Sequence, residues 1–364
     1  MNLLDKIKEK IGMKKNEPFS VSKYPKRLSI ENTYRCNLNC IMCPKNYNDD
    51  ENEDLSLEKI KLIIKKIPKL KDVTLLGRGE TLIAKDIWKI LEFFEKKKIR
   101  TDIVTNGTLL TENNINKLKS VQGVWVSLDN AIPEKYKAIR NGDIQLVKNN
   151  LLNLHRLKPE ISIIIQAVLL EENINDLNHL VDFCVEVGAK QLMLIKVIGF
   201  DAELDKKNPV FNAIYQEKIN EVCNYAAEKN IKIITRDKNP SLEKTNCLEP
   251  FNTIRIALDG TVFPCCYIYE KTTDKKYFEE NFNGVCKQIP QSEYVIGNIF
   301  TDDIKKIWHN PKMEMIRNKL KITAQETKKE LTIEEFSKLR EETDLKESPC
   351  SYCDVCLYRW KSAC

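Results

Sequence analysis

Short apolar segments alternate with helical patterns along the first two thirds of the chain. Between Arg27 and Ile198, six segments are rich in β-branched and aliphatic residues. They read RLSIENTY, DVTLLGRG, TDIVTNG, GVWVSLDN, ISIIIQAVLL and QLMLIKVI. Between them, apolar residues recur every three or four positions, which is the spacing of one helix face. Buried strands that alternate with such helices predict a parallel sheet with right-handed crossovers.

The helical segments carry recognisable start signals. In SLEKIKLIIKKI, Ser56 can cap the first turn, and Glu58 lies where a helix start favours a carboxylate. The segment DIWKILEFFEKKK has the same apolar spacing. A further helix, FNAIYQEKINEVCNYAAEKN, and a short strand, IKIIT, complete this part. Six βα units do not by themselves decide whether the sheet closes into a barrel.

The composition changes in the last third of the chain. Residues 246–364 hold eight of the thirteen cysteines. A hairpin is predicted at IRIALDGTVFP, because Asp259 and Gly260 form a tight-turn signal between two β-rich runs. One amphipathic helix is predicted at IKKIWHNPKMEMIRNKL.

We expect three parts along the chain. Residues 1–24 begin with a basic amphipathic helix, residues 25–239 form the α/β domain, and residues 240–364 form a smaller cysteine-rich domain. The first helix is interpreted as docking on its own domain, with a membrane surface or a partner as alternatives. Residues 323–347 are rich in Glu and Lys and predict a charged, solvated helical insertion.

Charge and hydropathy exclude several partners. The 59 Lys and Arg against 53 Asp and Glu give a net charge of +6, but the charges are dispersed, so no nucleic-acid partner is predicted. The longest apolar run, ISIIIQAVLL, is far shorter than the roughly 20 residues of a membrane span. The opening MNLLDKIKEKIG has no apolar signal core, so the cysteines predict a reducing, cytoplasmic setting.

Three cysteines on one loop are the most informative residues. Cys36, Cys40 and Cys43 follow the strand segment RLSIE, in the run TYRCNLNCIMCP. Three thiolates can hold three irons of a four-iron cubane and leave the fourth iron open to an exogenous ligand. The alternative is a zinc site, since C-x2-C is also zinc spacing. A structural zinc site needs a nearby fourth ligand, and no Cys or His follows Cys43 until His155.

This C-x3-C-x2-C loop resembles the signature of the radical S-adenosylmethionine (SAM) superfamily. The resemblance implies an α/β fold with an open, partial (βα)6 barrel of the TIM type. It also implies a [4Fe-4S] cluster whose unique iron is chelated by the amino and carboxylate groups of SAM. Reductive cleavage of SAM then gives methionine and a 5'-deoxyadenosyl radical, which abstracts hydrogen from a substrate. A reductant such as flavodoxin or ferredoxin and sensitivity to oxygen are further implications.

The segment LGRGE matches a family stretch that contacts the amino group of SAM. In the family this stretch is Gly-Gly-Glu, and Gly79 and Glu80 are the matching positions. Arg78 replaces one family glycine, and Thr81 replaces the usual proline.

Further positions resemble the family's SAM contacts. Asn106 follows the third strand, and Ser127 and Asp129 end the fourth, where the family has polar groups that face the ribose and methionine portions. Arg140, in KAIRNG, matches an arginine that pairs with the SAM carboxylate, and a guanidinium fork suits a carboxylate. Met42 stands where the family usually has an aromatic residue, and its thioether can pack on adenine.

A second group of cysteines resembles the auxiliary-cluster domains called SPASM and twitch. Cys247 is followed after twelve residues by Gly260 and after four more by Cys265. The resemblance implies a small α+β domain with at least one auxiliary [4Fe-4S] cluster. Its ligands would be Cys247, Cys265 and two of the group Cys350, Cys353 and Cys356.

The end of this domain departs from the family pattern. A complete SPASM domain shows C-x2-C-x5-C-x3-C, whereas this chain has C-x2-C-x2-C and then seven residues before Cys364. A second auxiliary cluster therefore stays open, with Cys266, Cys286 and Cys364 as spare ligands. A zinc ribbon is the alternative, since C-x2-C pairs are its hallmark.

These features predict a radical SAM enzyme in which the auxiliary cluster near Cys265 accepts or relays an electron. Most SPASM-type members act on peptides or proteins, so we expect oxidation, cross-linking or epimerisation of such a substrate. A sugar or aminocyclitol dehydrogenase or epimerase is the alternative, and a non-catalytic iron-sulfur or zinc scaffold is the second. Cys286 is a candidate hydrogen donor if the product is an epimer.

Overall fold

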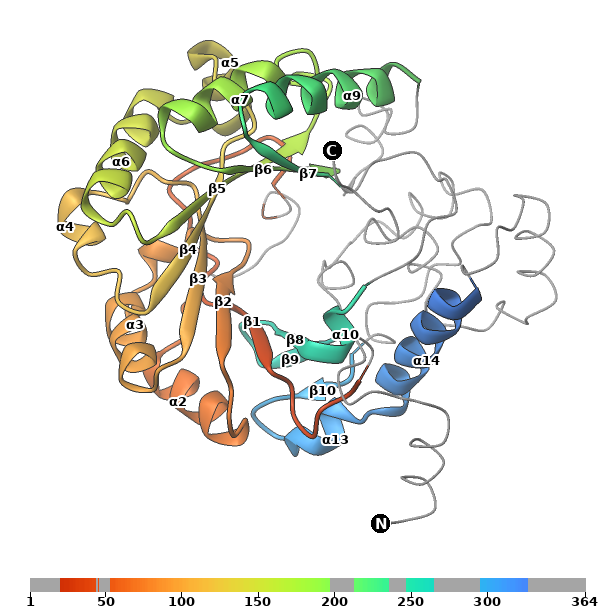
Figure 1. Ribbon diagram of the computed structural model, residues 1–364. Helices are drawn as coiled ribbons and strands as arrows, with labels where there is room; N and C mark the ends of the chain where they lie inside the picture. The colour runs from red at the N-terminus through yellow and green to blue at the C-terminus, as the bar shows by residue number, and fades with distance from the viewer. Residues whose placement is uncertain are drawn as a thin grey trace.

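The computed structural model describes residues 20–43, 45, 53–196, 213–235, 247–264 and 295–326. Figure 1 shows a strongly curved sheet with helices along its outer side. The strands are β1 (Arg27–Glu31), β2 (Asp72–Leu76), β3 (Arg100–Thr105), β4 (Val121–Ser127), β5 (Ser162–Leu169), β6 (Gln191–Lys196), β7 (Lys232–Thr235), β8 (Thr253–Ile256), β9 (Thr261–Phe263) and β10 (Gly297–Asn298). The helices are α2 (Leu57–Lys66), the 3-10 helix η2 (Thr81–Ile83), α3 (Ile87–Lys96), α4 (Glu112–Ile115), α5 (Pro133–Arg140), α6 (Ile144–Leu157), α7 (Leu177–Glu186), α9 (Ala213–Glu228), α10 (Glu249–Asn252), α13 (Ile304–Trp308) and α14 (Pro311–Glu326).

The strands form one sheet in the order β10-β9-β8-β1-β2-β3-β4-β5-β6-β7. Every pair from β1 to β7 is parallel. The edge strands β10 and β7 do not pair with each other, so the sheet is an open, partial barrel. The six predicted strands and their parallel arrangement are confirmed, as is the predicted cap of α2, where Ser56 accepts a hydrogen bond from the amide of Lys59.

The predicted hairpin near residue 259 is also confirmed. β8 and β9 pair antiparallel, and Gly260 occupies the turn with φ of +87°, which favours glycine. β8 also pairs in parallel with β1, with Arg27 opposite Thr253. The hairpin therefore extends the barrel sheet, a pairing that the sequence did not predict.

The single amphipathic helix predicted at IKKIWHNPKMEMIRNKL is wrong, because two helices occupy this segment. α13 ends at Trp308, and α14 begins at Pro311. The residue before a proline disfavours helical backbone, whereas proline itself fits the first turn of a helix. Asn310 and Pro311 therefore break the pattern into two.

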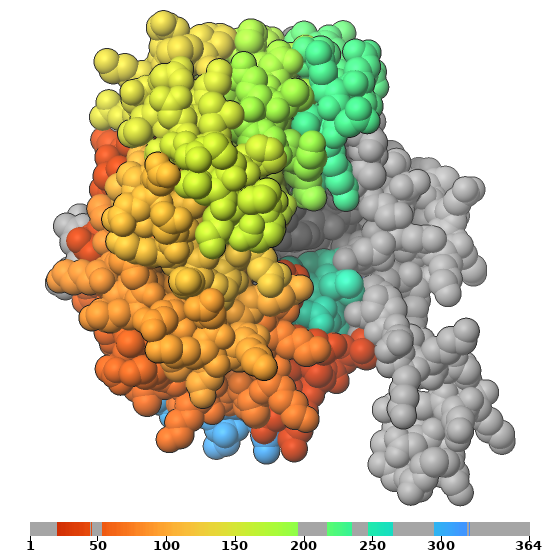
Figure 2. Space-filling model, turned by 60° about the vertical axis from the view of Figure 1, so that its left-hand side comes forward, coloured from red at the N-terminus to blue at the C-terminus, as the bar shows by residue number. Residues whose placement is uncertain are grey.

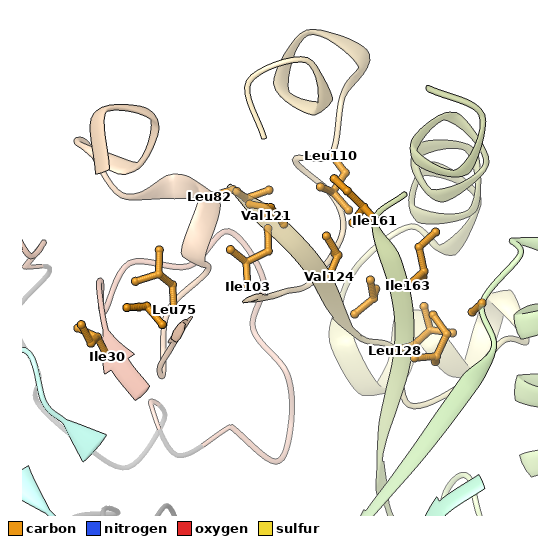
Figure 3. Packing of buried hydrophobic residues seen from close by; sticks show 14 of the residues in the cluster. Ile30, Leu75, Leu82, Ile103, Leu110, Val121, Val124, Leu128, Ile161 and Ile163 are labelled. Atoms are coloured by element: carbon orange, nitrogen blue, oxygen red, sulfur yellow. The ribbon is translucent and has the colours of Figure 1, made fainter. Parts of the chain in front are cut away.

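The main core lies between the sheet and its outer helices. Figure 3 shows Ile30, Leu75, Ile103 and Val124 following one another from strand to strand on this side. All four are fully buried. Because side chains alternate along a strand, their sequence neighbours face the inner side of the sheet.

The inner side faces the open centre of the curved sheet in Figure 1. Figure 2 shows a recess between the green surface, whose residues end at 235, and the teal surface of residues 247–264. Within the described ranges, no helix is both long and apolar enough to cross a bilayer. The first predicted helix, and residues 327–347 of the predicted insertion, lie outside the described residues, whereas residues 323–326 belong to α14.

Candidate functional site

The cysteine loop begins at the carboxyl end of β1 and is clamped at its start. Arg35, directly before Cys36, donates from Nε to Asp54 Oδ1 at 3.0 Å and from Nη2 to the carbonyl of Ile83 at 2.8 Å. Asp54 also accepts a hydrogen bond from Thr33 Oγ1 at 2.6 Å. These contacts tie the loop to the segment before α2 and to η2, so its position is fixed from two sides.

The three cysteines are half-buried and lie on a compact turn. The amide of Cys43 donates to the carbonyl of Cys40 at 3.1 Å, and the amide of Ile41 donates to the carbonyl of Ile139 at 2.9 Å. The loop is therefore fastened to the end of α5, and its cysteines are presented together at the strand ends.

Donors from outside the loop approach two of the sulfurs. Asn106 Nδ2 lies 4.0 Å from Cys36 Sγ, and Arg140 Nη1 lies 3.8 Å from Cys40 Sγ. Burial raises the pKa of the Cys36 thiol and raises the pKa of Cys40 to about 11, although Arg140 acts in the opposite direction. Coordination to a metal deprotonates a thiol outright, so a bound metal centre would supply the charge that these thiolates need.

The donor set fits a cluster better than a single ion. Among the described residues, no three side chains of His, Cys, Asp or Glu converge as the ligands of one ion would. In a cubane each thiolate binds a different iron, so its ligands need not meet at one point. Three cysteine thiolates with N–H donors directed at their sulfurs are the environment that an iron-sulfur cluster takes.

The segment LGRGE lies against the start of the cysteine loop. The amide of Gly79 donates to the carbonyl of Thr33 at 3.1 Å, and the amide of Glu80 donates to the carbonyl of Arg35 at 2.8 Å. A Cβ on Gly79 would lie 2.4 Å from the Thr33 carbonyl oxygen. The glycine is therefore required for this close approach.

Arg78, which replaces a family glycine, is accommodated by burial against an acid. Its Nε lies 3.6 Å from Glu31 Oε1, its Nη2 donates to Tyr34 Oη at 2.9 Å, and its guanidinium lies 4.5 Å from the Tyr34 ring centroid. Burial raises the pKa of Glu31, while Arg78 and Arg255 act in the opposite direction. The side chain of Arg78 thus packs against β1 without displacing the backbone of LGRGE.

The carboxylate of Glu80 is fully engaged by its own protein. It accepts hydrogen bonds from Thr105 Oγ1 at 2.7 Å, from the amide of Leu82 at 3.0 Å and from the amide of Asn106 at 2.6 Å. Burial raises its pKa, and these donors act against that shift. The side chain therefore joins β2 to β3, and the backbone is what this segment offers to a ligand.

Asn106 belongs to a network that reaches back to the cysteine loop. Its Nδ2 donates to Asn37 Oδ1 at 2.9 Å, and its Oδ1 accepts from Thr108 Oγ1 at 2.7 Å. Asn37 Nδ2 in turn donates to Thr108 Oγ1 at 2.8 Å. Asn150 of α6 donates hydrogen bonds from Nδ2 to the backbone carbonyls of residues 107 and 108. The amide of Asn106 is thus oriented from several sides.

Asp129 and Arg140 form a buried ion pair. Arg140 Nε lies 2.6 Å from Asp129 Oδ2, and the Asp129 carboxylate also accepts from the amide of Val168 at 2.6 Å. Burial raises the pKa of Asp129 despite the adjacent guanidinium. Burial acts to lower the pKa of Arg140, but the carboxylate of Asp129 raises it above its ordinary value. Ser127 accepts a hydrogen bond from Gln166 Nε2 at 2.7 Å.

Met42 packs in a small apolar cluster beside the loop. Its side chain is 6% exposed and shares the cluster with Ile139 and Leu170. The expected packing on adenine stays a prediction, as do the SAM contacts expected for Gly79, Glu80 and the polar residues described above.

Of the expected auxiliary ligands, only Cys247 lies among the described residues. It is buried in a cluster with Phe251, Ile316 and Leu320, which joins α10 to α14. The other expected ligands lie outside the described residues, as does Cys286; they are Cys265, Cys350, Cys353 and Cys356.

Several residues that shape the site were missed from the sequence. Arg35 and Asp54 clamp the loop, and Glu31 balances Arg78. Tyr136 of α5 is fully buried beside Arg140. The position of Arg35 next to Cys36 was a usable signal, whereas the partners of Glu31 and Tyr136 depend on tertiary packing.

An open parallel barrel with three cysteines after its first strand has the arrangement of an iron-sulfur protein, with these cysteines at the reactive edge of the sheet. A family model described as "Radical SAM superfamily" matches residues 30–184, and a model described as "Iron-sulfur cluster-binding domain" matches residues 247–356. The chain belongs to the radical SAM superfamily, and its cofactors are SAM and [4Fe-4S] clusters.

Two relatives show the range of named activities. A "Probable GTP 3',8-cyclase" of Methanocaldococcus jannaschii is 30% identical over 266 residues, covering 66% of this chain and 83% of the relative. A "Tungsten-containing aldehyde ferredoxin oxidoreductase cofactor-modifying protein" of Pyrococcus furiosus is 26% identical over 318 residues, covering 80% of this chain and 83% of the relative.

A solved structure shares the fold. Streptococcus suis SuiB bound to its precursor peptide SuiA has a TM-score of 0.62 at 19% identity, covering 82% of this chain and 68% of SuiB. At this identity the likeness concerns the fold.

Proposed function

We propose that this radical SAM enzyme modifies a peptide or protein, by oxidation, cross-linking or epimerisation, with the substrate held on the inner face of the sheet. With cluster and SAM bound, these cofactors supply a 5'-deoxyadenosyl radical that takes a hydrogen atom from the substrate. The protein's part is to hold both cofactors, to orient the substrate and to exclude water.

Different strand ends would bind different parts of the two cofactors. Cys36, Cys40 and Cys43 would hold the cluster. Because the Glu80 carboxylate is already engaged, the backbone around Gly79 and Glu80 would meet the amino group of SAM. A guanidinium has five donors, so Arg140 can serve Asp129, Cys40 and the SAM carboxylate together.

The charge on the inner face carries the proposal. At its carboxyl end, Glu31 lies between Arg78 and Arg255, so these three side chains leave an excess of only one positive charge. A triphosphate carries several negative charges and needs a matching cluster of cations. A peptide needs no such excess.

The other side of the inner face is more apolar. Register places Val168 opposite Ile195, and Gln166 opposite Met193, on β5 and β6. Met193 is 8% exposed, and the other three are half-buried. Half-buried apolar side chains at the edge of a recess suit the side chains of a peptide better than a sugar.

A nucleotide or a small cofactor is the second candidate, because the relatives of Methanocaldococcus jannaschii and Pyrococcus furiosus have such names. The same inner face would then have to bind a compact polar molecule, with Arg255 as a contact for its anionic group.

The test begins with anaerobic reconstitution and SAM cleavage under dithionite. Peptides encoded beside this chain, and GTP, are then offered separately, and products are followed by mass spectrometry. Loss of two hydrogen masses from a peptide indicates oxidation or cross-linking. Epimerisation is indicated when the peptide takes up one deuterium in D2O but keeps its mass in ordinary water. Conversion of GTP with no change in any peptide would refute the proposal.

Two cysteine variants separate the steps. Cys36→Ala should abolish formation of 5'-deoxyadenosine. Cys350→Ala should spare that cleavage and stop turnover of the true substrate, because the auxiliary cluster is proposed to accept or relay an electron. Full turnover by Cys350→Ala would remove the relay role while leaving the radical step intact.

A further inference from the structure

Helix α5 directs two polar side chains toward the cysteine loop. Tyr136 and Arg140 are four residues apart, so they lie on one helix face. Arg140 reaches Cys40 Sγ at 3.8 Å, and the helix end is fastened to the loop by the hydrogen bond between Ile41 and Ile139. The face of α5 that carries Tyr136 is thus turned to the cluster loop.

The ring of Tyr136 lies near that loop. A Cβ on Gly142 would lie 3.0 Å from Tyr136 Cε1, 3.4 Å from its hydroxyl oxygen and 3.3 Å from Leu38 Cδ2. Leu38 lies between Cys36 and Cys40 in the loop. The phenol end of Tyr136 and the side chain of the loop residue Leu38 therefore both lie next to Gly142.

The hydroxyl of Tyr136 is a buried donor with no acceptor among the described residues. Its side chain is 0% exposed, and its oxygen has no hydrogen-bond partner in this part of the chain. A buried hydroxyl left unbonded destabilises the fold, and buried hydroxyls almost always have a partner. A phenol keeps its proton near neutral pH, so the hydroxyl stays a donor.

A cluster on Cys36, Cys40 and Cys43 would bring sulfur acceptors to this place. Thiolate and sulfide sulfurs accept hydrogen bonds, and such bonds stabilise the more negative, reduced form of a cluster. We propose that Tyr136 is a positioning residue whose hydroxyl donates a hydrogen bond to a sulfur of this cluster and raises its reduction potential. The role goes beyond the proposed function, since it holds for any substrate.

The test is an EPR-monitored redox titration of the anaerobic holoenzyme with SAM bound, comparing the full chain with Tyr136→Phe. At a fixed solution potential, the variant should show about a tenfold higher ratio of oxidised to reduced cluster. This ratio corresponds to a reduction potential lower by about 59 mV for one electron. Tyr225→Phe is the matched control, because the Tyr225 hydroxyl already donates a hydrogen bond to Asp182 on α7 at 2.7 Å.

A second variant covers the case in which Tyr136→Phe binds less iron. Site-specific replacement of Tyr136 by a fluorinated tyrosine makes the hydroxyl a stronger donor and should shift the ratio the other way. A full complement of iron with an unchanged potential in either variant would overturn the inference. That result would leave the radical chemistry itself untouched, since SAM cleavage is measured separately in the same samples.

Discussion

Gly79→Ala should separate the SAM-binding segment from the cysteine loop. The added Cβ would lie 2.4 Å from the carbonyl oxygen of Thr33 and 2.6 Å from that of Arg35. Both neighbours are backbone atoms of the clamped loop, so neither can turn aside as a side chain would. The loop and the LGRGE segment must therefore move apart.

The size of the effect follows from these contacts. Ordinary van der Waals contact begins near 3.4 Å, so an oxygen now at 2.4 Å must retreat by about 1.0 Å. That shift stretches the hydrogen bond from the Gly79 amide, now 3.1 Å, and the one from the Glu80 amide, now 2.8 Å. Two lost hydrogen bonds of about 1 kcal/mol each and about 1–3 kcal/mol of overpacking give a destabilisation of about 3–5 kcal/mol.

Chemical denaturation and SAM binding to the reconstituted protein measure the two consequences. Gly123→Ala is the control, because its added Cβ meets the carboxylate oxygen of Asp102 at 2.7 Å, and a side-chain oxygen can rotate away. We expect the Gly79 variant to lose several kcal/mol of unfolding free energy and most of its SAM affinity, while the control loses little. Equal losses in the two variants would show that the close backbone approach at Gly79 has no special role.

Three further changes test how the site is supported. Lys66→Met should cost about 2–4 kcal/mol in denaturation, because its ammonium donates to three backbone carbonyls of residues 299–302, whereas the exposed Lys65→Met should cost less than about 0.5 kcal/mol. Arg317→Met should cost about 3 kcal/mol and lower the auxiliary iron content, because this fully buried side chain donates to the carbonyls of residues 250 and 308 and joins α14 to α10. Burial acts to raise the pKa of Asp54, but hydrogen bonds led by that from Arg35 hold this pKa below its ordinary value. The contribution of Asp54 to the unfolding free energy is therefore present above the ordinary pKa and is lost as pH falls through the folded pKa. Asp54→Asn should remove this part of the acid dependence of the unfolding free energy, and an unchanged pH profile would contradict it.

Local patterns predicted the elements of the fold because their signals lie within each element. The cap of α2 by Ser56 and the turn at Gly260 are of this kind. The break between α13 and α14 also has a local signal, since Pro311 lies at the junction, but the apolar spacing of one helix continues on both sides of it.

Pairings between distant segments could not be read in the same way. The strand segment TIRI has no feature that selects an edge of the sheet, yet β8 pairs with β1. Asp129 and Arg140 were interpreted as separate SAM contacts, but the left-handed backbone at Asp129, with φ of +63°, and the return of α5 bring them together. Local spacing identifies the residues of a site, whereas their partners depend on the tertiary fold.

The pairing of β8 with β1 places Cys36 and Cys247 toward opposite ends of these two strands. Cys36 follows the carboxyl end of β1, whereas Cys247 precedes α10, which leads into the amino end of β8. The two strands are parallel and in register from Arg27 opposite Thr253, so the length of β1, about 15 Å, lies between these ends. The inner face between them is where a substrate would lie. Under the proposed function, with Cys247 among the auxiliary ligands, a substrate radical formed near Cys36 would pass its electron along these strands. Radical formation and oxidation would then take place at separate metal centres.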